Sequence, residues 1–344
     1  MQLSSLAERP DADKNLAVPK NLCNFLSRLI ISISYKATEY RNTGRLDLPD
    51  MPYRIIDTYP AFKKCWRKTC SWDLDSQITA WEKEYMAEYP ELFRLQVKSY
   101  AEIGIDWRSI ARERIFPKLP GLLPLIEETW RKLRTIIPDV YRRFTNFWNQ
   151  DFDVVFTIYV GIGCGAGWAT EYMEQYAVLL GLENIAEQRW HRCRELEGLL
   201  AHELSHIAHM VLRGSTAEEF EKLEANPLFL LYSEGFAMRG EHHLTGERWR
   251  IASDAAWLKW CRENMGLLAL EYLRRVDKGV YVNDFFGSWL EVEGRSQTGY
   301  FLGHELVKSL EETLSLREIA LLDTEEVMRR TREFLENAIQ KSRR

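Results

Sequence analysis

The sequence predicts an α+β fold that is mostly helical, with one small sheet beside a helix at residues 194–212. Apolar side chains recur with helical periodicity through residues 46–149 and through most of the chain after Arg194. Two short runs rich in β-branched and aromatic residues, 153–160 and 176–182, lie together between these helical parts. Because the strands are grouped and the helices lie to either side of them in the chain, we expect one sheet packed against helices.

The composition is that of a globular protein without a strong charge bias. Of 344 residues, 46% are apolar and 28% are charged, and the formal net charge is -5, so no nucleic-acid partner is expected. The first residues, MQLSSLAERPDADKN, are polar and acidic where a secretory signal would be basic and then apolar. No window reaches the roughly 18 consecutive apolar residues of a membrane-spanning helix. Six cysteines without a CxxC pair favour reduced thiols and a cytoplasmic location.

Changes in pattern divide the chain into three parts. Residues 1–45 are expected to form an N-terminal tail and a helix, and residues 46–150 a mostly helical part. Residues 151–344 contain the two strands and are expected to carry the chemistry, packed with 46–150 as one unit. The helices predicted in this last part span 194–212, 228–243, 255–275, 299–313 and 323–341, and the stretch 214–226 is predicted to be a loop.

A glycine-rich stretch separates the two predicted strands. The sequence DVVFTIYVGIGCGAGW, which begins at Asp153, predicts two strands joined by a glycine-rich turn that borders a substrate cleft. GIGCGA, residues 161–166, also matches a relaxed dinucleotide-binding fingerprint. Only about ten residues separate Gly165 from Tyr176, however, which is too few for the helical crossover between parallel strands that such a site requires.

The helix at 194–212 contains the motif HExxH, within AHELSHIAHM at residues 201–210. With about 100° of rotation per residue, His202 and His206 lie on one side of the helix, opposite an apolar side. The apolar side consists of Leu200, Leu204, Ile207 and Val211. One side of this helix is therefore expected to pack in the core while the other presents two imidazoles.

The spacing of the motif suits a metal ion. His202 and His206 are about 6 Å apart along the helix axis, so their rings can reach the roughly 3.3 Å nitrogen spacing of a tetrahedral zinc ion. Glu203 projects beside them and is placed to act as a general base on a water activated by the metal. His209 lies about 10.5 Å along the axis from His202 and is assigned no metal. A polar helix face is the alternative, but a chance HExxH is expected only about 0.01 times in such a chain.

A third ligand must come from another segment, because a catalytic zinc site has three protein ligands and one open position. The segment SEGFA at 233–237 resembles the NEGFA segment of the zinc aminopeptidases, which belong to the gluzincins. The resemblance implies a zincin-like fold and makes Glu234 the third zinc ligand. The stretch between His206 and Glu234 is longer than in that family, and the loop at 214–226 can absorb the difference.

Other side chains near Glu234 are alternative ligands, and the metzincins are an alternative family. Glu241 matches a second glutamate of the resembling segment, and Glu241, His242 and His243 are competing ligands. Alternatively, Glu234 caps a helix or forms a salt bridge. The chain lacks the HExxHxxGxxH continuation of the metzincins, so the gluzincin resemblance is preferred.

Four further features are candidates to border the site. The resemblance implies a downstream tyrosine that stabilises the oxyanion, and Tyr300 in SQTGYFLGHEL is the candidate. His304 is either an alternative donor or an ordinary buried histidine. The strand YAVLLGL at 176–182 is expected to be the edge strand that pairs with an extended substrate. The segment GLEN faintly resembles the GAMEN segment of aminopeptidases, which makes Glu183 a weak candidate for binding a free amine.

Together these observations predict a zinc-dependent peptidase that acts on a peptide or protein substrate. His202, His206 and Glu234 would hold Zn²⁺, Glu203 would act as the general base and Tyr300 would stabilise the oxyanion. Two other classes stay open: a catalytically silent zinc-binding interaction domain, and a zinc hydrolase of a non-peptide substrate. The sequence leaves undetermined the substrate sequence, endo- or exo-cleavage and the oligomeric state.

Overall fold

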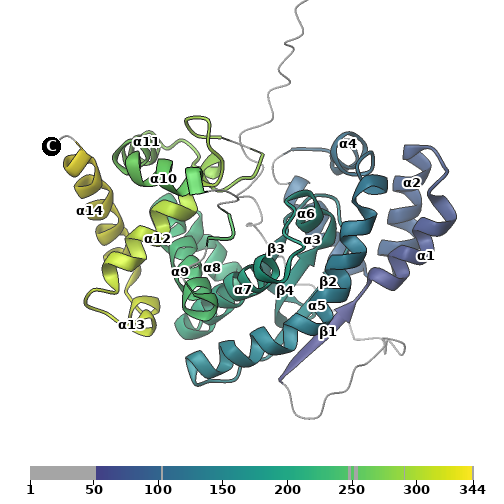
Figure 1. Cartoon of the computed structure of the whole chain (residues 1–344), viewed down its shortest axis with the longest axis horizontal. Coiled ribbons are helices and arrows are strands. Elements are labelled where there is room, and N and C mark those ends of the chain that lie inside the picture. The colour runs from purple at the N-terminus through teal and green to yellow at the C-terminus, as the bar shows by residue number, and fades with distance from the viewer. Residues whose placement is uncertain (1–51, 102–103, 247–248, 252–254, 290, 343–344) are drawn as a thin grey trace, which may run out of the picture.

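The computed structural model describes residues 52–101, 104–246, 249–251, 255–289 and 291–342. The predicted N-terminal tail and helix at 1–45 lie outside these described residues. Across them the protein is mostly helical with one four-stranded sheet, which confirms the α+β prediction. Figure 1 shows helices α1 and α2 to the right of the sheet and helices α9 to α14 to its left. No described helix combines the length and the apolar character needed to span a membrane.

The sheet is mixed and has the order β1-β2-β4-β3. Strands β1, β2 and β4 are parallel, and β3 is antiparallel to β4. The strands are β1 (Tyr53–Asp57), β2 (Val154–Tyr159), β3 (Gly167–Tyr172) and β4 (Gln175–Gly181). All six residues of β2 are buried, as expected for an inner strand of a sheet covered on both faces. Strands β2 and β4 correspond to the two predicted runs.

The predicted connection between these two strands was wrong. They are parallel neighbours, and the glycine-rich stretch leads into the additional strand β3 instead of forming the turn. The turn lies between β3 and β4 at Met173 and Glu174, whose φ angles of 54° and 60° fit a two-residue hairpin. Neither residue is the Asn or Gly that usually announces such a turn, so the sequence did not reveal it. In consequence β3, and not β4, forms the edge of the sheet.

The first part of the chain is mostly helical, as predicted, apart from β1. Its long helix α5 packs on α6 and α7 and so joins this part to the HExxH helix. The elements are α1 (Tyr59–Thr69), α2 (Leu74–Ala80), η1 (Trp81–Tyr85), η2 (Met86–Glu88), α3 (Pro90–Ala101), α4 (Trp107–Ile110), η3 (Ala111–Ile115) and α5 (Leu119–Trp148).

The second part carries most of the predicted helices and some unpredicted ones. Its elements are α6 (Leu182–Glu187), α7 (Cys193–Arg213), α8 (Ala217–Glu224), α9 (Pro227–Thr245), α10 (Ala255–Glu263), α11 (Met265–Asp277), η4 (Asn283–Phe285), α12 (Thr298–Leu310), α13 (Leu316–Ala320) and α14 (Thr324–Ser342). Helices α7, α9, α12 and α14 confirm four predictions. The helix predicted at 255–275 is divided at Asn264 into α10 and α11.

The stretch 214–226, predicted to be a loop, contains helix α8 and is a second correction. Thr216 caps this helix: its hydroxyl accepts a hydrogen bond from the Glu219 backbone N–H, and the Glu219 carboxylate accepts one from the Thr216 N–H. This reciprocal capping box satisfies two backbone donors at the start of the helix. The sequence TAEE carries that signature, so the helix was within reach of sequence analysis.

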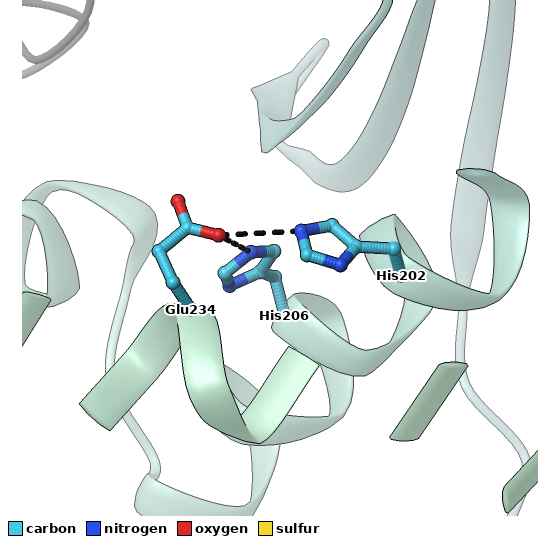
Figure 2. A group of neighbouring side chains, drawn as sticks. All are labelled: His202, His206 and Glu234. Atoms are coloured by element: carbon cyan, nitrogen blue, oxygen red, sulfur yellow. Dashed lines mark ion pairs between the residues drawn. The ribbon is translucent and has the colours of Figure 1, made fainter. Parts of the chain in front are cut away.

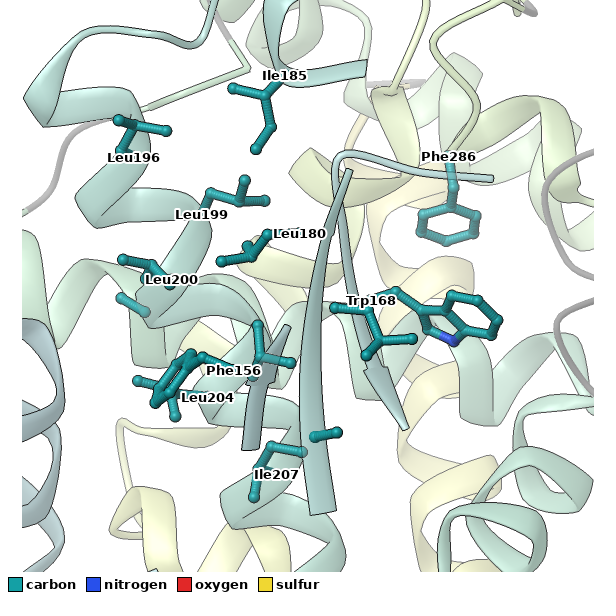
Figure 3. Close-up of a cluster of buried hydrophobic side chains, with 14 of the residues drawn as sticks. Phe156, Trp168, Leu180, Ile185, Leu196, Leu199, Leu200, Leu204, Ile207 and Phe286 are labelled. Atoms are coloured by element: carbon teal, nitrogen blue, oxygen red, sulfur yellow. The ribbon is translucent and has the colours of Figure 1, made fainter. Parts of the chain in front are cut away.

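The core between α7 and the sheet fixes the orientation of the HExxH helix. Leu200, Leu204 and Ile207 of α7 are fully buried, as the apolar periodicity predicted. Figure 3 shows them facing Phe156 of β2 and Leu180 of β4. Each such side chain stabilises the folded state by about 1.5 to 3 kcal/mol when fully buried. Because this side of α7 packs in the core, the side that carries His202 and His206 is directed away from that core.

Candidate metal centre

Three side chains from two helices converge on one point. His202 and His206 come from successive turns of α7, and Glu234 comes from α9. Glu234 Oε2 lies 3.3 Å from His202 Nε2 and 3.5 Å from His206 Nε2. Figure 2 shows the carboxylate oxygen facing both imidazole nitrogens. One ligand atom from each residue lies within 4.8 Å of the others.

Glycines at two helix crossings place α9 where Glu234 can reach α7. A Cβ atom on Gly235 would lie 2.1 Å from the backbone oxygen of Gly303 in α12, so the two backbones are in direct contact there. A Cβ atom on Gly240 would lie 2.1 Å from Ser205 Oγ of α7. Larger residues at these positions would push the helices apart. The close approach of α7, α9 and α12 therefore depends on the absence of side chains at Gly235, Gly240 and Gly303.

The donor set fits a zinc ion. Four ligands at 2.0 to 2.1 Å in a tetrahedron lie roughly 3.3 Å from one another, and the two separations involving Glu234 are 3.3 Å and 3.5 Å. Glu234 Oε2 is buried and has no hydrogen bond of acceptable geometry among the described residues. A buried carboxylate oxygen without a hydrogen bond is costly unless a cation satisfies it. Two imidazoles and one carboxylate also leave the fourth position that a catalytic zinc site keeps for water.

The charges of the three side chains are strongly coupled. Burial raises the pKa of Glu234, but the two adjacent imidazoles outweigh burial and bring its pKa down to about 2. Burial lowers the pKa of His202, but Glu234 and Glu241 outweigh it and bring that pKa up to about 9. The pKa of His206 is raised in the same way, by Glu234 against burial. The carboxylate is thus ionised and stabilises positive charge beside it, which a divalent cation would supply in place of protons.

The three competing ligands have other partners. Glu241 lies behind His202, with its Oε2 3.6 Å from His202 Nδ1 and 3.3 Å from Arg250 Nη2. Its position requires Gly198, where a Cβ atom would lie 2.6 Å from Glu241 Oε1. A carboxylate on the far nitrogen of a metal-bound histidine orients the ring and raises its basicity.

The remaining two competing ligands, His242 and His243, also contact other side chains. His242 Nδ1 is 2.9 Å from His304 Nε2, and His243 forms an ion pair with Glu311. Neither belongs to the group of side chains that could hold a metal. The choice of Glu234 over its rivals follows from these contacts.

Glu203 borders the same pocket as the three ligands. Its carboxylate lies against the backbone of β3, because a Cβ atom on Gly167 would be 2.5 Å from Glu203 Oε1. Burial raises the pKa of Glu203, against a lowering effect of His202 and His206. A buried carboxylate with a raised pKa holds a proton more readily than an exposed one, as a general base that later acts as an acid requires.

The pocket itself has a volume of about 270 Å³ and is lined by several separate segments. The glycine-rich stretch Gly163–Gly167 and the first half of β3 form one wall, as the predicted position beside a cleft requires. Helix α8 contributes Phe220, Glu221 and Glu224. This wall was not predicted, because the stretch 214–226 has been expected to form a loop. Burial raises the pKa of Glu224 to about 7.

Tyr300 and His304 occupy different environments. Tyr300 lines the pocket, and its ring centroid is 5.7 Å from that of His202. His304 is buried on the next turn of α12, where Nε2 contacts His242 and Arg239 and Nδ1 contacts Glu305 at 2.9 Å. It does not line the pocket. Of the two, only Tyr300 is in a position to meet a molecule in the pocket.

Two other residues from the sequence analysis lie outside the metal centre. The Glu183 carboxylate accepts hydrogen bonds from the backbone N–H groups of Gly161 (2.7 Å) and Gly163 (3.2 Å). Burial raises its pKa to about 7 despite these bonds. Glu183 therefore supports the glycine-rich stretch from behind and does not line the pocket. His209, which was assigned no metal, is fully buried among aromatic rings.

Comparison of the chain with protein-family models, with curated proteins and with solved structures finds no match. The geometry and chemistry of the site are therefore the basis for inferring its function.

Proposed function

We propose that the protein is a zinc-dependent peptidase of the gluzincin type, with a zincin-like fold around α7. The observation that carries the proposal is the convergence of His202, His206 and Glu234 at ligand spacing, with Glu203 bordering the same pocket. Zinc bound by the three ligands would lower the pKa of a water molecule toward 7 and polarise the scissile carbonyl.

Two protein groups have roles in the proposed reaction. Glu203 accepts the proton from the attacking water and then donates it to the nitrogen of the leaving amine. The Tyr300 hydroxyl donates a hydrogen bond to the carbonyl oxygen of the scissile bond as that oxygen becomes negative. Both side chains line the pocket that contains the metal ligands, so one bound substrate can meet both.

The open edge of β3 supports a peptide as the substrate. β3 pairs with β4 on one side, and no described strand pairs with its other side. Tyr172 and Gln175 flank the two-residue turn and therefore form a hydrogen-bonded pair. Hydrogen bonding to β4 alternates along β3, so the backbone N–H and C=O groups of Gly167 and Ala169 point toward the open edge. Both residues also line the pocket. An extended peptide can add to this edge through main-chain hydrogen bonds, which places its backbone beside Glu203.

The test combines metal analysis with a peptide-library digest of wild type, Glu203→Gln and Glu197→Gln. Glu197 is the matched control, because it lies on the same helix but pairs with Arg143 at 3.0 Å, away from the pocket. We expect zinc in all three proteins and a loss of cleavage of about 10²- to 10⁴-fold in Glu203→Gln alone.

Each other result rejects a defined part of the proposal. Equal cleavage by wild type and Glu203→Gln would remove Glu203 from the reaction. Zinc without cleavage of any peptide by the wild type would indicate a silent zinc-binding domain or a hydrolase of other substrates. Absence of zinc after purification in zinc-containing buffer would reject the metal assignment.

A further inference from the structure

Two largely buried residues at the pocket have side-chain amides without a hydrogen-bond partner among the described residues. Asn184, in the first turn of α6, is 7% exposed, and Gln297, directly before α12, is 9% exposed. Both line the pocket that contains the metal ligands. Within the part of the chain that the structure describes, neither side-chain amide makes a hydrogen bond, although the neighbouring polar groups do.

The two amides face the pocket and are not sealed in the protein interior, because neither belongs to the fully buried polar atoms without a partner. Amides of largely buried residues are normally paired within the protein, whereas the donors and acceptors of these two are left for molecules in the pocket. Gln297 also has a left-handed backbone, with φ of 60° and ψ of 25°, which glycine adopts without strain and glutamine does not. Two polar groups that the protein itself leaves unsatisfied in a pocket are groups that a bound molecule can satisfy.

The chemistry of the two side chains indicates what they bind. A primary amide offers two N–H donors and a carbonyl acceptor, and it carries no charge. Its natural complement is another amide, because the N–H and C=O of a peptide group supply the matching acceptor and donor. The amides are therefore suited to uncharged main chain rather than to a charged group.

We propose that Asn184 and Gln297 hydrogen-bond to the main chain of the peptide substrate and, with the open edge of β3, hold it in register for cleavage. This proposal rests on the proposed peptidase function and adds the residues that bind the substrate backbone. Gln297 lies three residues before Tyr300 and Asn184 lies three residues after the end of β4. Each of the two amides therefore lies in a chain segment that borders the proposed reaction site.

The test measures KM, kcat and zinc content of Asn184→Leu and Gln297→Gly with the most rapidly cleaved decapeptide of a random library. Loss of one uncharged hydrogen bond should raise KM between about 2-fold and about 12-fold and change kcat by less than about 2-fold. Zinc content should stay unchanged. Gln297→Gly also relieves the left-handed backbone, so it should fold at least as stably as wild type, and a rise in KM could not come from misfolding.

The control is Gln77→Leu, which removes a buried amide far from the pocket. Gln77 is 6% exposed and donates to the carbonyl oxygens of Cys70 and Trp72. This variant should lose stability and keep the wild-type KM. An equal rise in KM in Gln77→Leu would show that any buried amide has this effect and would overturn the proposal.

Substrate analogues identify the partner of Asn184. In a series of decapeptides, each amide bond in turn is replaced by an ester, which removes one N–H donor. One replacement should weaken binding to wild type but not to Asn184→Leu, whereas equal losses at every position would overturn the assignment. A wild type that cleaves peptides with KM unchanged in both pocket variants would overturn this inference alone. A wild type that cleaves no peptide would overturn the peptidase function as well.

Discussion

Helix α7 carries histidines in two opposite environments. His202 and His206 face carboxylates, and Glu234 raises the pKa of both imidazoles against the effect of burial. His209, one turn further on, packs against Phe220 and Phe236 at ring distances of 4.8 Å and 4.2 Å. Burial, followed by the charges of Arg213 and His206, lowers its pKa well below the usual range.

The difference shows that the neighbours of a histidine, and not its helix, determine its chemistry. Both nitrogens of His209 are buried without a hydrogen bond in the described structure, so this ring stays neutral and acts as an aromatic core residue. His202 is equally buried, but a carboxylate lies on each of its nitrogens. Burial beside carboxylates makes an imidazole a candidate metal ligand, and burial among aromatic rings makes it a core residue.

The largest expected effect is the difference in zinc affinity between two variants, each of which removes one imidazole from one of the two environments. His206→Ala should lower zinc affinity by more than about 100-fold, because losing a ligand exceeds the 10- to 100-fold effect of losing an outer partner. Peptide cleavage should be lost with the zinc. His209→Phe should bind zinc like wild type. Zinc titration against a competing chelator measures both, and equal affinity in wild type and His206→Ala would contradict the metal centre.

A smaller effect on zinc affinity is expected when the carboxylate near His202 Nδ1 is neutralised. Glu241→Gln should reduce zinc affinity by about 10- to 100-fold, because the ring loses the charged partner that orients it and raises its basicity. The matched control is Glu305→Gln, which changes a carboxylate 2.9 Å from His304 Nδ1, outside the pocket. The same chelator titration should show wild-type affinity for the control. Identical affinities of the two variants would mean that Glu241 does not tune the metal ligand.

In the aromatic environment, the expected effect is on the stability of the fold and not on zinc affinity. The folded protein keeps His209 neutral, whereas the unfolded chain binds a proton at this residue below about pH 6.5. The unfolding free energy of wild type should therefore fall by about 2 kcal/mol more than that of His209→Phe between about pH 7 and about pH 5. Urea unfolding at both pH values measures this difference. Parallel pH dependence in the two proteins would show that His209 is protonated when folded.

Local signals predicted most helices, but several elements were missed for identifiable reasons. Strand β3 begins in a glycine-rich stretch and ends in a turn made by Met173 and Glu174, so neither its composition nor its turn resembles the usual pattern. Strand β1 is only five residues long and lies in a helical region. Helix α8 carried a capping signature at Thr216 and Glu219 that could have identified it.

The two histidines of the candidate metal centre on α7 could be predicted from the sequence, because their relative position depends on the local geometry of one helix. Residues four apart on a helix share a face wherever the helix packs, so His202, Glu203 and His206 were placed by chain geometry alone. Leucines on the opposite side of the same helix determined which face would be buried.

Only the tertiary structure decided which side chains complete the site. Glu234, Glu241, His242 and His243 lie on one helix, and sequence spacing alone could not rank them without the family resemblance. The contacts of Gly235 and Gly240 with neighbouring helices fix the position of α9, and this position directs Glu234 to the imidazoles and Glu241 to the far side of His202. Such contacts join residues distant in the chain and depend on the packing of whole helices, which local periodicity does not encode.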